Sequence, residues 1–151
     1  MSINSYDFFC KNIEKQKLER IQEDLKYGLE MEKAVCPILE QYFHDSLTKT
    51  SQYHCSDWFG DLGTFYELKS RKDIEPATYA TTIFPCYKCK IGENNQLILV
   101  FHFSLNNETY YIEYNKELFS RFQTKWVEAC RNSNTAILHY EIPIGQLKQI
   151  I

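Results

Sequence analysis

Hydrophobic residues in the first 45 positions recur at helical spacing. They form one stripe from Leu29 to Phe43, which predicts a helix over that range. Gly28 predicts a break before it, because glycine disfavours continuation of a helix, and residues 1–26 then form a separate helical segment. Glu32 lies inside the apolar stripe. A carboxylate at such a position needs a partner, because burying it unpaired is costly.

The middle of the chain shows strand patterns. Ser51–Phe59 and Thr64–Ser70 predict an antiparallel pair, joined by a three-residue loop, 61–63, with its glycine in the left-handed conformation. Leu97–Phe103 is a continuous apolar run, typical of a strand buried on both faces. After a turn, Thr109–Tyr114 alternates as the returning strand.

The last third predicts one helix and one strand. Asn115 can cap a helix that runs to about Cys130 and turns Trp126 towards the core. Ala136–Ile142 predicts the last strand, ended by Pro143. With 151 residues, we expect a single domain of mixed α+β (α/β) class, in which helices flank a central sheet of about four or five strands.

Composition narrows the function classes. The chain is 44% hydrophobic, which excludes a disordered protein. Neither a membrane-spanning run nor a secretory signal is evident, so we expect a soluble intracellular protein. The net charge of −3 does not indicate a passive nucleic-acid binder. Between positions 69 and 90, however, five basic residues are set against two acidic ones.

Six cysteines are present, and in a reducing compartment we expect free thiols. Cys86 and Cys89 have the spacing of half a zinc site, to which His54 and Cys55 could add the other ligands. Because a second matching pair is missing, buried or incidental cysteines are the favoured interpretation and a structural zinc is the alternative.

The hairpin register places Asp57 opposite Glu67, and Lys69 shares the face of Glu67. Two opposed carboxylates repel each other unless a cation lies between them. Carboxylate oxygens select Mg²⁺ or Mn²⁺, which can activate water for phosphodiester hydrolysis. An adjacent lysine can orient or deprotonate that water. Glu32 on the neighbouring helix is expected to reach the same cluster.

The spacing of Asp57 from Glu67-Leu68-Lys69, with Glu32 upstream, resembles the PD-(D/E)XK nuclease superfamily, in particular its RecB-like and Holliday-junction-resolvase-like branches. The stretch 66–71, followed by 79–82 and by Lys90-Ile91, is similar to small nucleases of large DNA viruses and phages. The match covers about residues 28–91 and departs from the signature by having Ser56 where proline precedes the aspartate.

The resemblance implies a restriction-endonuclease-like core and a metal-dependent deoxyribonuclease acting in recombination, repair or genome processing. The resemblance also implies that the cleavage products carry 5′-phosphate and 3′-hydroxyl ends. If the protein is viral, we expect it in the host cytoplasm or nucleus. We expect double-stranded or branched DNA as substrate and no membrane partner. A homodimer is compatible with this expectation. The expected metal ligands are Asp57, Glu67, the Leu68 carbonyl and Glu32, and Lys69 handles the water.

Arg71, Lys72, Lys88 and Lys90 are the candidates for contacts to nucleic acid. Two other functions stay open. One is a non-catalytic binding or assembly module that keeps the fold, and the other is an RNA endonuclease of the cap-snatching type. For each charged residue the plainer interpretation is a solvated surface group.

Overall fold

The computed structural model of the chain describes residues 5–51, 54, 56–128 and 135–151, with side chains from residue 10 onward. The chain divides into two compact units, Met1–Ala34 and Val35–Ile151. The first unit is helical, and the second holds every described strand.

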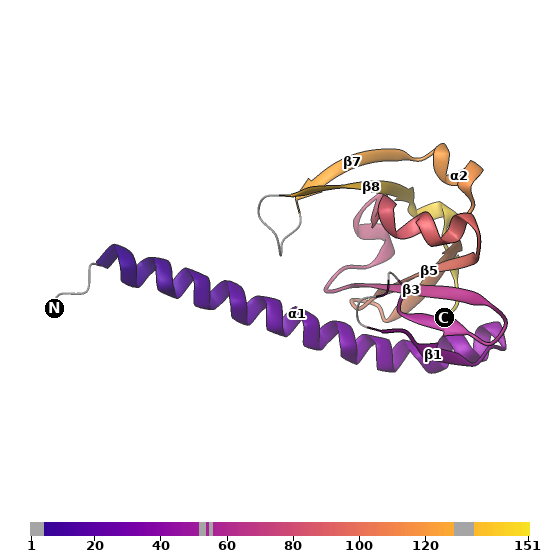
Figure 1. Ribbon diagram of the computed structural model, residues 1–151, viewed down its shortest axis with the longest axis horizontal. Helices are drawn as coiled ribbons and strands as arrows, with labels where there is room; N and C mark the ends of the chain where they lie inside the picture. The colour runs from indigo at the N-terminus through magenta and orange to yellow at the C-terminus, as the bar shows by residue number, and fades with distance from the viewer. Residues whose placement is uncertain (1–4, 52–53, 55, 129–134) are drawn as a thin grey trace. The chain divides into compact units, whose positions relative to one another are not determined.

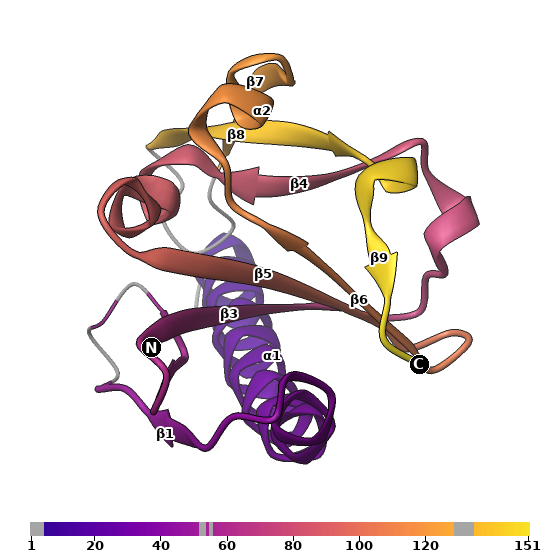
Figure 2. The same ribbon diagram turned by 90° about the vertical axis from the view of Figure 1, so that its right-hand side faces the viewer.

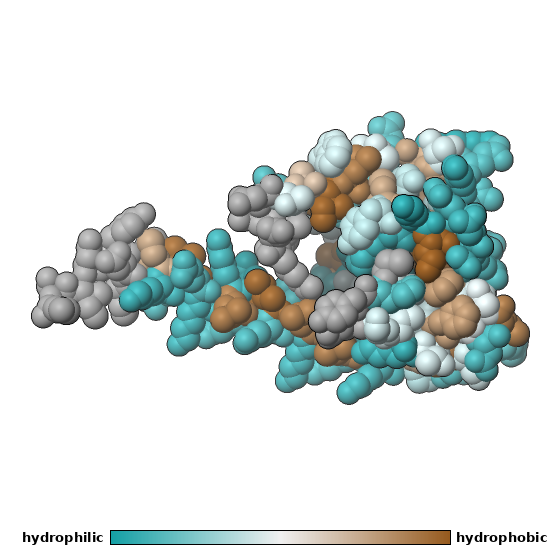
Figure 3. Space-filling view, viewed as in Figure 1, coloured by the Kyte–Doolittle hydropathy of each residue, from teal (hydrophilic) through white to brown (hydrophobic). Residues whose placement is uncertain are grey.

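Helix α1 (Ser5–Phe43) begins in the first unit and ends in the second (Figure 1). It continues through Gly28, so the predicted break is wrong. One glycine costs a helix only about 1 kcal/mol relative to alanine, and its neighbours include the strong helix formers Leu, Glu, Met and Lys. In the first unit, α1 carries mostly hydrophilic side chains with separate hydrophobic ones between them (Figure 3). None of the described helices has the length and apolarity needed to cross a membrane.

Two sheets make up most of the second unit. Within the described chain, the larger one has the strand order β1 (Leu47–Lys49), β2 (Trp58–Gly60), β3 (Thr64–Arg71), β5 (Gln96–Phe103), β6 (Glu108–Glu113) and β9 (Lys148–Gln149). The smaller one has the order β4 (Thr81–Pro85), β8 (Ala136–Pro143) and β7 (Gln123–Glu128). Strands β4 and β8 run above β3, β5 and β6 as a second layer (Figure 2).

The larger sheet is mixed, because β3 and β5 are parallel while its other pairs are antiparallel. The parallel connection passes through three elements: η1 (Pro76–Thr78), β4 and η2 (Cys86–Glu93). A third short helix, η3 (Ile144–Gln146), joins β8 to β9. The mixed α+β class is thus confirmed, although the strands are divided between two sheets rather than placed in one.

The β2–β3 hairpin has the predicted register, since Trp58 pairs with Tyr66 and Phe59 with Phe65. Gly63 closes its loop at a φ of +91°, a left-handed conformation that glycine adopts without strain. The first strand is shorter than predicted, because it begins at Trp58 rather than Ser51.

Strand β5 is buried on both faces, as predicted. Leu99 and Phe101 point into the core between the sheets, where the ring centre of Phe101 lies 6.4 Å from that of Phe84 in β4. Ile98 points to the opposite face and pairs with Tyr66. The Tyr66 ring packs against Phe43 at the end of α1, 5.5 Å between ring centres. The α1 end therefore covers one face of the larger sheet, and the smaller sheet covers the other.

The long helix predicted after Asn115 is wrong. Asn115 does cap α2 (Lys116–Ser120) by accepting a hydrogen bond from the Leu118 N–H, but the helix ends after five residues. Residues 123–128 instead form β7, in which Trp126 is 70% exposed. Thr, Trp and Val within this stretch favour a strand, and pairing with β8 satisfies the main chain.

Candidate active site

Alternate residues of β3 turn their side chains towards the smaller sheet and η2. Glu67, Lys69 and Arg71 share this face because side chains alternate along a strand. The ammonium of Lys69 lies 5.7 Å from the ring centre of Phe84 in β4. As predicted, Glu67 and Lys69 therefore lie on the same face of β3. This face packs against the smaller sheet instead of being exposed to solvent.

The Glu67 carboxylate is paired with two lysines. Its side chain is only 4% exposed, and Lys88 Nζ donates a hydrogen bond of 2.6 Å to Oε1. Lys69 Nζ lies 3.7 Å from the same oxygen. We expected carboxylates that repel each other until a divalent cation binds. This expectation is corrected, because η2 supplies an ammonium group that neutralises Glu67 in the metal-free chain.

The two lysines differ in the ease with which they lose a proton. Burial, followed by repulsion from Lys88, lowers the pKa of Lys69 to about 8. Burial also acts to lower the pKa of Lys88, but the attraction and the hydrogen bond to Glu67, with smaller contributions from Lys69 and Tyr87, together outweigh it, and the pKa of Lys88 is raised. Lys88 therefore stays positively charged beside Glu67 at mildly alkaline pH, at which Lys69 loses its proton.

Asp57 lies one residue before β2, at the edge of β3. Its N–H donates to the Tyr66 carbonyl at 2.9 Å, and Trp58 is the residue that pairs with Tyr66. Two residues thus oppose one, as in a β-bulge, which replaces the direct pairing of Asp57 with Glu67 that we predicted. The shift lets Asp57 Oδ2 accept a hydrogen bond of 2.7 Å from the Leu68 N–H.

The oxygen donors around Leu68 suit a hard divalent cation. The N–H and carbonyl of one strand residue point to the same edge, so the Leu68 carbonyl faces the edge where Asp57 lies. The carboxylates of Asp57 and Glu67 on the neighbouring residues add oxygens of the kind that Mg²⁺ and Mn²⁺ prefer, although Lys88 engages that of Glu67. Among the described residues, no group of three or more His, Cys, Asp or Glu side chains could hold a metal ion. A metal here depends on the two carboxylates and this carbonyl.

The remaining predicted residues lie in different settings. Glu32 belongs to the first compact unit, whereas Asp57 and Glu67 belong to the second, so its approach to them stays a prediction. Lys72 follows β3 directly, and Lys90 lies in η2. Both are exposed, as a contact to a nucleic-acid backbone requires.

Arg71 joins the two sheets. Its Nε donates to Thr82 Oγ1 at 3.1 Å, and its Nη2 donates to the Ile83 carbonyl, both in β4. The guanidinium carbon lies 5.6 Å from the ring centre of Phe101, and burial lowers the pKa of Arg71 to about 10. We predicted a contact to nucleic acid at this residue. In the structure its guanidinium is engaged within the fold.

Cys86 and Cys89 lie in η2, and Cys89 is buried. Burial raises the pKa of both thiols, that of Cys89 to about 12. Zinc binds the thiolate form, so these surroundings favour free thiols. Of the other suggested ligands, His54 is exposed, and Cys55 lies outside the described residues.

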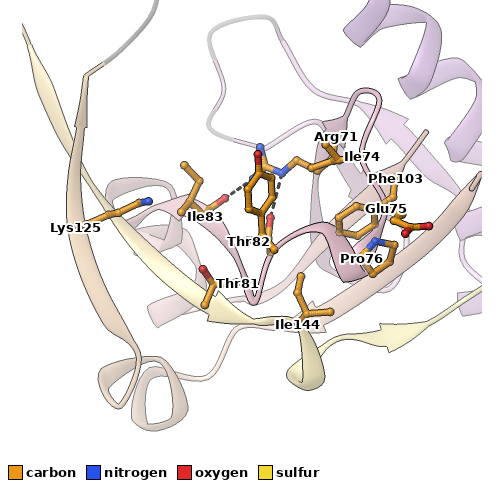
Figure 4. Close-up of a pocket in the computed structure, with 11 residues that line it drawn as sticks. Arg71, Ile74, Glu75, Pro76, Thr81, Thr82, Ile83, Phe103, Lys125 and Ile144 are labelled. Atoms are coloured by element: carbon orange, nitrogen blue, oxygen red, sulfur yellow. Dashed lines mark hydrogen bonds between the residues drawn. The ribbon is translucent and has the colours of Figure 1, made fainter. Parts of the chain in front are cut away.

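A pocket of about 280 Å³ at the end of β3 was not predicted. Arg71 of β3 and Ile144 of η3 lie on opposite sides of it, and Lys125 of β7 approaches from a third side (Figure 4). Its lining comes from several elements far apart in the chain, so no local sequence pattern reveals it.

Comparison of the chain with family models, curated proteins and solved structures finds no match.

Proposed function

We propose that this protein is a Mg²⁺- or Mn²⁺-dependent nuclease that hydrolyses phosphodiester bonds in DNA. The observation that carries the proposal is the cluster at Glu67: a buried carboxylate with Lys69 on the same strand face, beside an Asp57 carboxylate anchored on the Leu68 N–H. A buried ion pair adds little net stability, because the cost of desolvating its charges offsets their attraction, so a carboxylate buried with two lysines is a candidate functional group.

Each residue has a defined part in this proposal. Asp57, Glu67 and the Leu68 carbonyl hold the metal, which when bound supplies an activated water and stabilises charge on the phosphate. Lys69 orients the attacking water from a position 3.7 Å from Glu67 Oε1. Lys88 holds the Glu67 carboxylate in place, because its ammonium donates a hydrogen bond of 2.6 Å to Oε1. Exposed Lys72 and Lys90 contact phosphates of the DNA backbone.

A cleavage panel tests the proposal. Linear duplex, branched and single-stranded DNA, and RNA, are incubated with the protein in Mg²⁺, in Mn²⁺ and in EDTA. We expect metal-dependent cleavage of DNA, and we expect Lys69→Ala to lower its rate by about 10² or more, the usual scale for a lost acid–base or electrostatic group. Lys148→Ala, an exposed lysine on β9, is the matched control and should cleave like the wild type.

The second candidate is a non-catalytic nucleic-acid-binding or assembly module. The 2.6 Å pair between Lys88 and Glu67 favours it, because the ammonium occupies the carboxylate oxygen that a bound metal ion would use. This module predicts no cleavage in any metal and a loss of affinity as the main effect of Lys69→Ala. Cleavage of RNA alone would instead favour the RNA endonuclease.

A further inference from the structure

The pocket at the end of β3 lies beside the charge cluster. Arg71 lines it and follows Lys69 by two residues on the same strand face. Figure 4 shows Arg71 entering the pocket from β3, while Thr82 and Ile83 approach from β4. Consecutive strand residues are about 3.3 Å apart, so the Arg71 backbone lies about 7 Å from that of Lys69, and a substrate bound at Lys69 lies close to the pocket.

The lining favours a partly apolar molecule over an anion. Most of its side chains are apolar or aromatic: Ile74, Pro76, Tyr79, Ile83, Phe103 and Ile144. The cations are already engaged, since Arg71 donates to the Ile83 carbonyl and Lys125 lies 3.7 Å from Glu141. Glu75 adds a negative charge to the lining. A free phosphate would meet little uncompensated positive charge here.

The size of the pocket and its polar groups fit one heteroaromatic ring system. Its volume, about 280 Å³, lies near the lower limit of ligand pockets, which is roughly 300 Å³. The Thr81 hydroxyl offers a donor and an acceptor to the edge of a ring. Tyr79 is 63% exposed and can stack on an aromatic face from the solvent side.

We propose that this pocket binds one unstacked nucleobase of the DNA substrate, next to the phosphate that is cut. The inference rests on the proposed nuclease function and names its substrate class. A base inside an intact duplex is stacked and paired, and extruding it costs free energy. The preferred substrate therefore has an unpaired nucleotide beside the cut, as in a single strand, a flap or a frayed end.

Binding is measured without cleavage, in EDTA, by the fluorescence anisotropy of labelled strands of about 12 nucleotides, a length within the range of single-strand sites. The probes are a single strand with all its bases, the same strand with abasic spacers, and the same sequence as a duplex. For the wild type we expect the base-bearing strand to bind at least about tenfold more tightly than the other two, the scale of one lost stacking contact.

Two variants test the pocket itself. Tyr79→Ala removes the stacking ring and should lower affinity for the base-bearing strand by about tenfold while leaving the abasic strand unchanged, and Tyr79→Trp should restore it. Ile144→Arg fills the pocket but adds a positive charge that attracts every strand, so the ratio of its affinities for the base-bearing and abasic strands should fall as in Tyr79→Ala. Tyr87→Ala is the matched control, because Tyr87 is 59% exposed and does not line the pocket.

Equal affinity of the wild type for base-bearing and abasic strands, or equal losses in Tyr79→Ala and Tyr87→Ala, would overturn the inference. The cleavage panel is read separately. Metal-dependent cleavage without base-dependent binding would refute the nucleobase pocket and support the nuclease function. Base-dependent binding that is lost in Tyr79→Ala, with no cleavage in any metal, would support the nucleobase pocket and refute the nuclease function.

Discussion

Replacing Lys88 with Met should destabilise the metal-free protein markedly. The substitution keeps an apolar stem of similar length but removes the ammonium 2.6 Å from Glu67 Oε1. The Glu67 side chain, 4% exposed, then keeps the more distant ammonium of Lys69 at 3.7 Å. The substitution thus measures how far the fold depends on the positive charge from η2.

The magnitude follows from the distances. At an effective dielectric constant of about 20, the Coulomb attraction is about 6 kcal/mol for the Lys88 pair and about 4 to 5 kcal/mol for the Lys69 pair, before the cost of desolvation. Removing one partner of a buried pair costs about 3–5 kcal/mol. Because Lys69 stays and the Lys88 side chain is 21% exposed, we expect a loss of about 2–3 kcal/mol. For a chain of this size that lowers Tm by roughly 4–12 °C.

Urea unfolding in EDTA, followed by circular dichroism, measures the effect in the wild type, Lys88→Met, Glu67→Gln and the double variant. Glu67→Gln should also destabilise, because it leaves two ammonium groups facing each other. The double variant should be more stable than the sum of the two losses predicts, by about 1–3 kcal/mol of coupling. Additive losses, or a Lys88→Met variant as stable as the wild type, would refute the assigned ion pair.

Three further predictions concern the metal, pH and the corrected strand. Millimolar Mn²⁺ or Mg²⁺ should raise the Tm of the wild type by binding the folded state, and Asp57→Asn with Glu67→Gln should abolish the shift in differential scanning fluorimetry; an unmoved wild type contradicts the metal site. The pKa of Lys69, about 8, lies below its ordinary value of 10.5, so between these pH values the unfolded chain binds more protons. The urea-derived stability of the metal-free wild type should therefore rise relative to Lys69→Met as the pH increases from about 8 to 10.5, and a constant difference would exclude the shift. In Trp58→Phe the remaining tryptophan is Trp126, 70% exposed, which acrylamide should quench readily; a shielded indole would contradict strand β7.

Local chemistry explains which elements could be predicted. The loop with Gly63 fixes the register of the β2–β3 hairpin, and the two-residue alternation of β3 places Glu67 and Lys69 on one face. Asn115 was correctly predicted as a helix cap, because its side chain bonds a nearby N–H. Each of these features depends on residues close together in the chain.

The wrong predictions concern segments and side chains whose structure depends on partners far away in the sequence. Apolar spacing after Asn115 matched a helix, but pairing with β8 recruits Gln123–Glu128 into the smaller sheet. The partner of Glu67 could not be predicted either, because Lys88 reaches it from η2, across β4. Arg71 is a similar case, since its hydrogen bonds run to β4. Sequence spacing gives no information on which layer a charged side chain will meet.

The parallel pairing of β3 with β5 makes the charge cluster a late product of folding. The β2–β3 hairpin can form locally, but β5 reaches β3 only after the chain has passed through β4 and η2. Such non-local pairing incurs loop-closure entropy before its contacts form, and it is therefore slow. A slip of one residue in this ladder would turn Glu67 to the opposite face of the sheet. A chain in that register would keep its strands and lack the cluster, so the register of this pair, beyond the presence of the strands, makes a folded molecule competent.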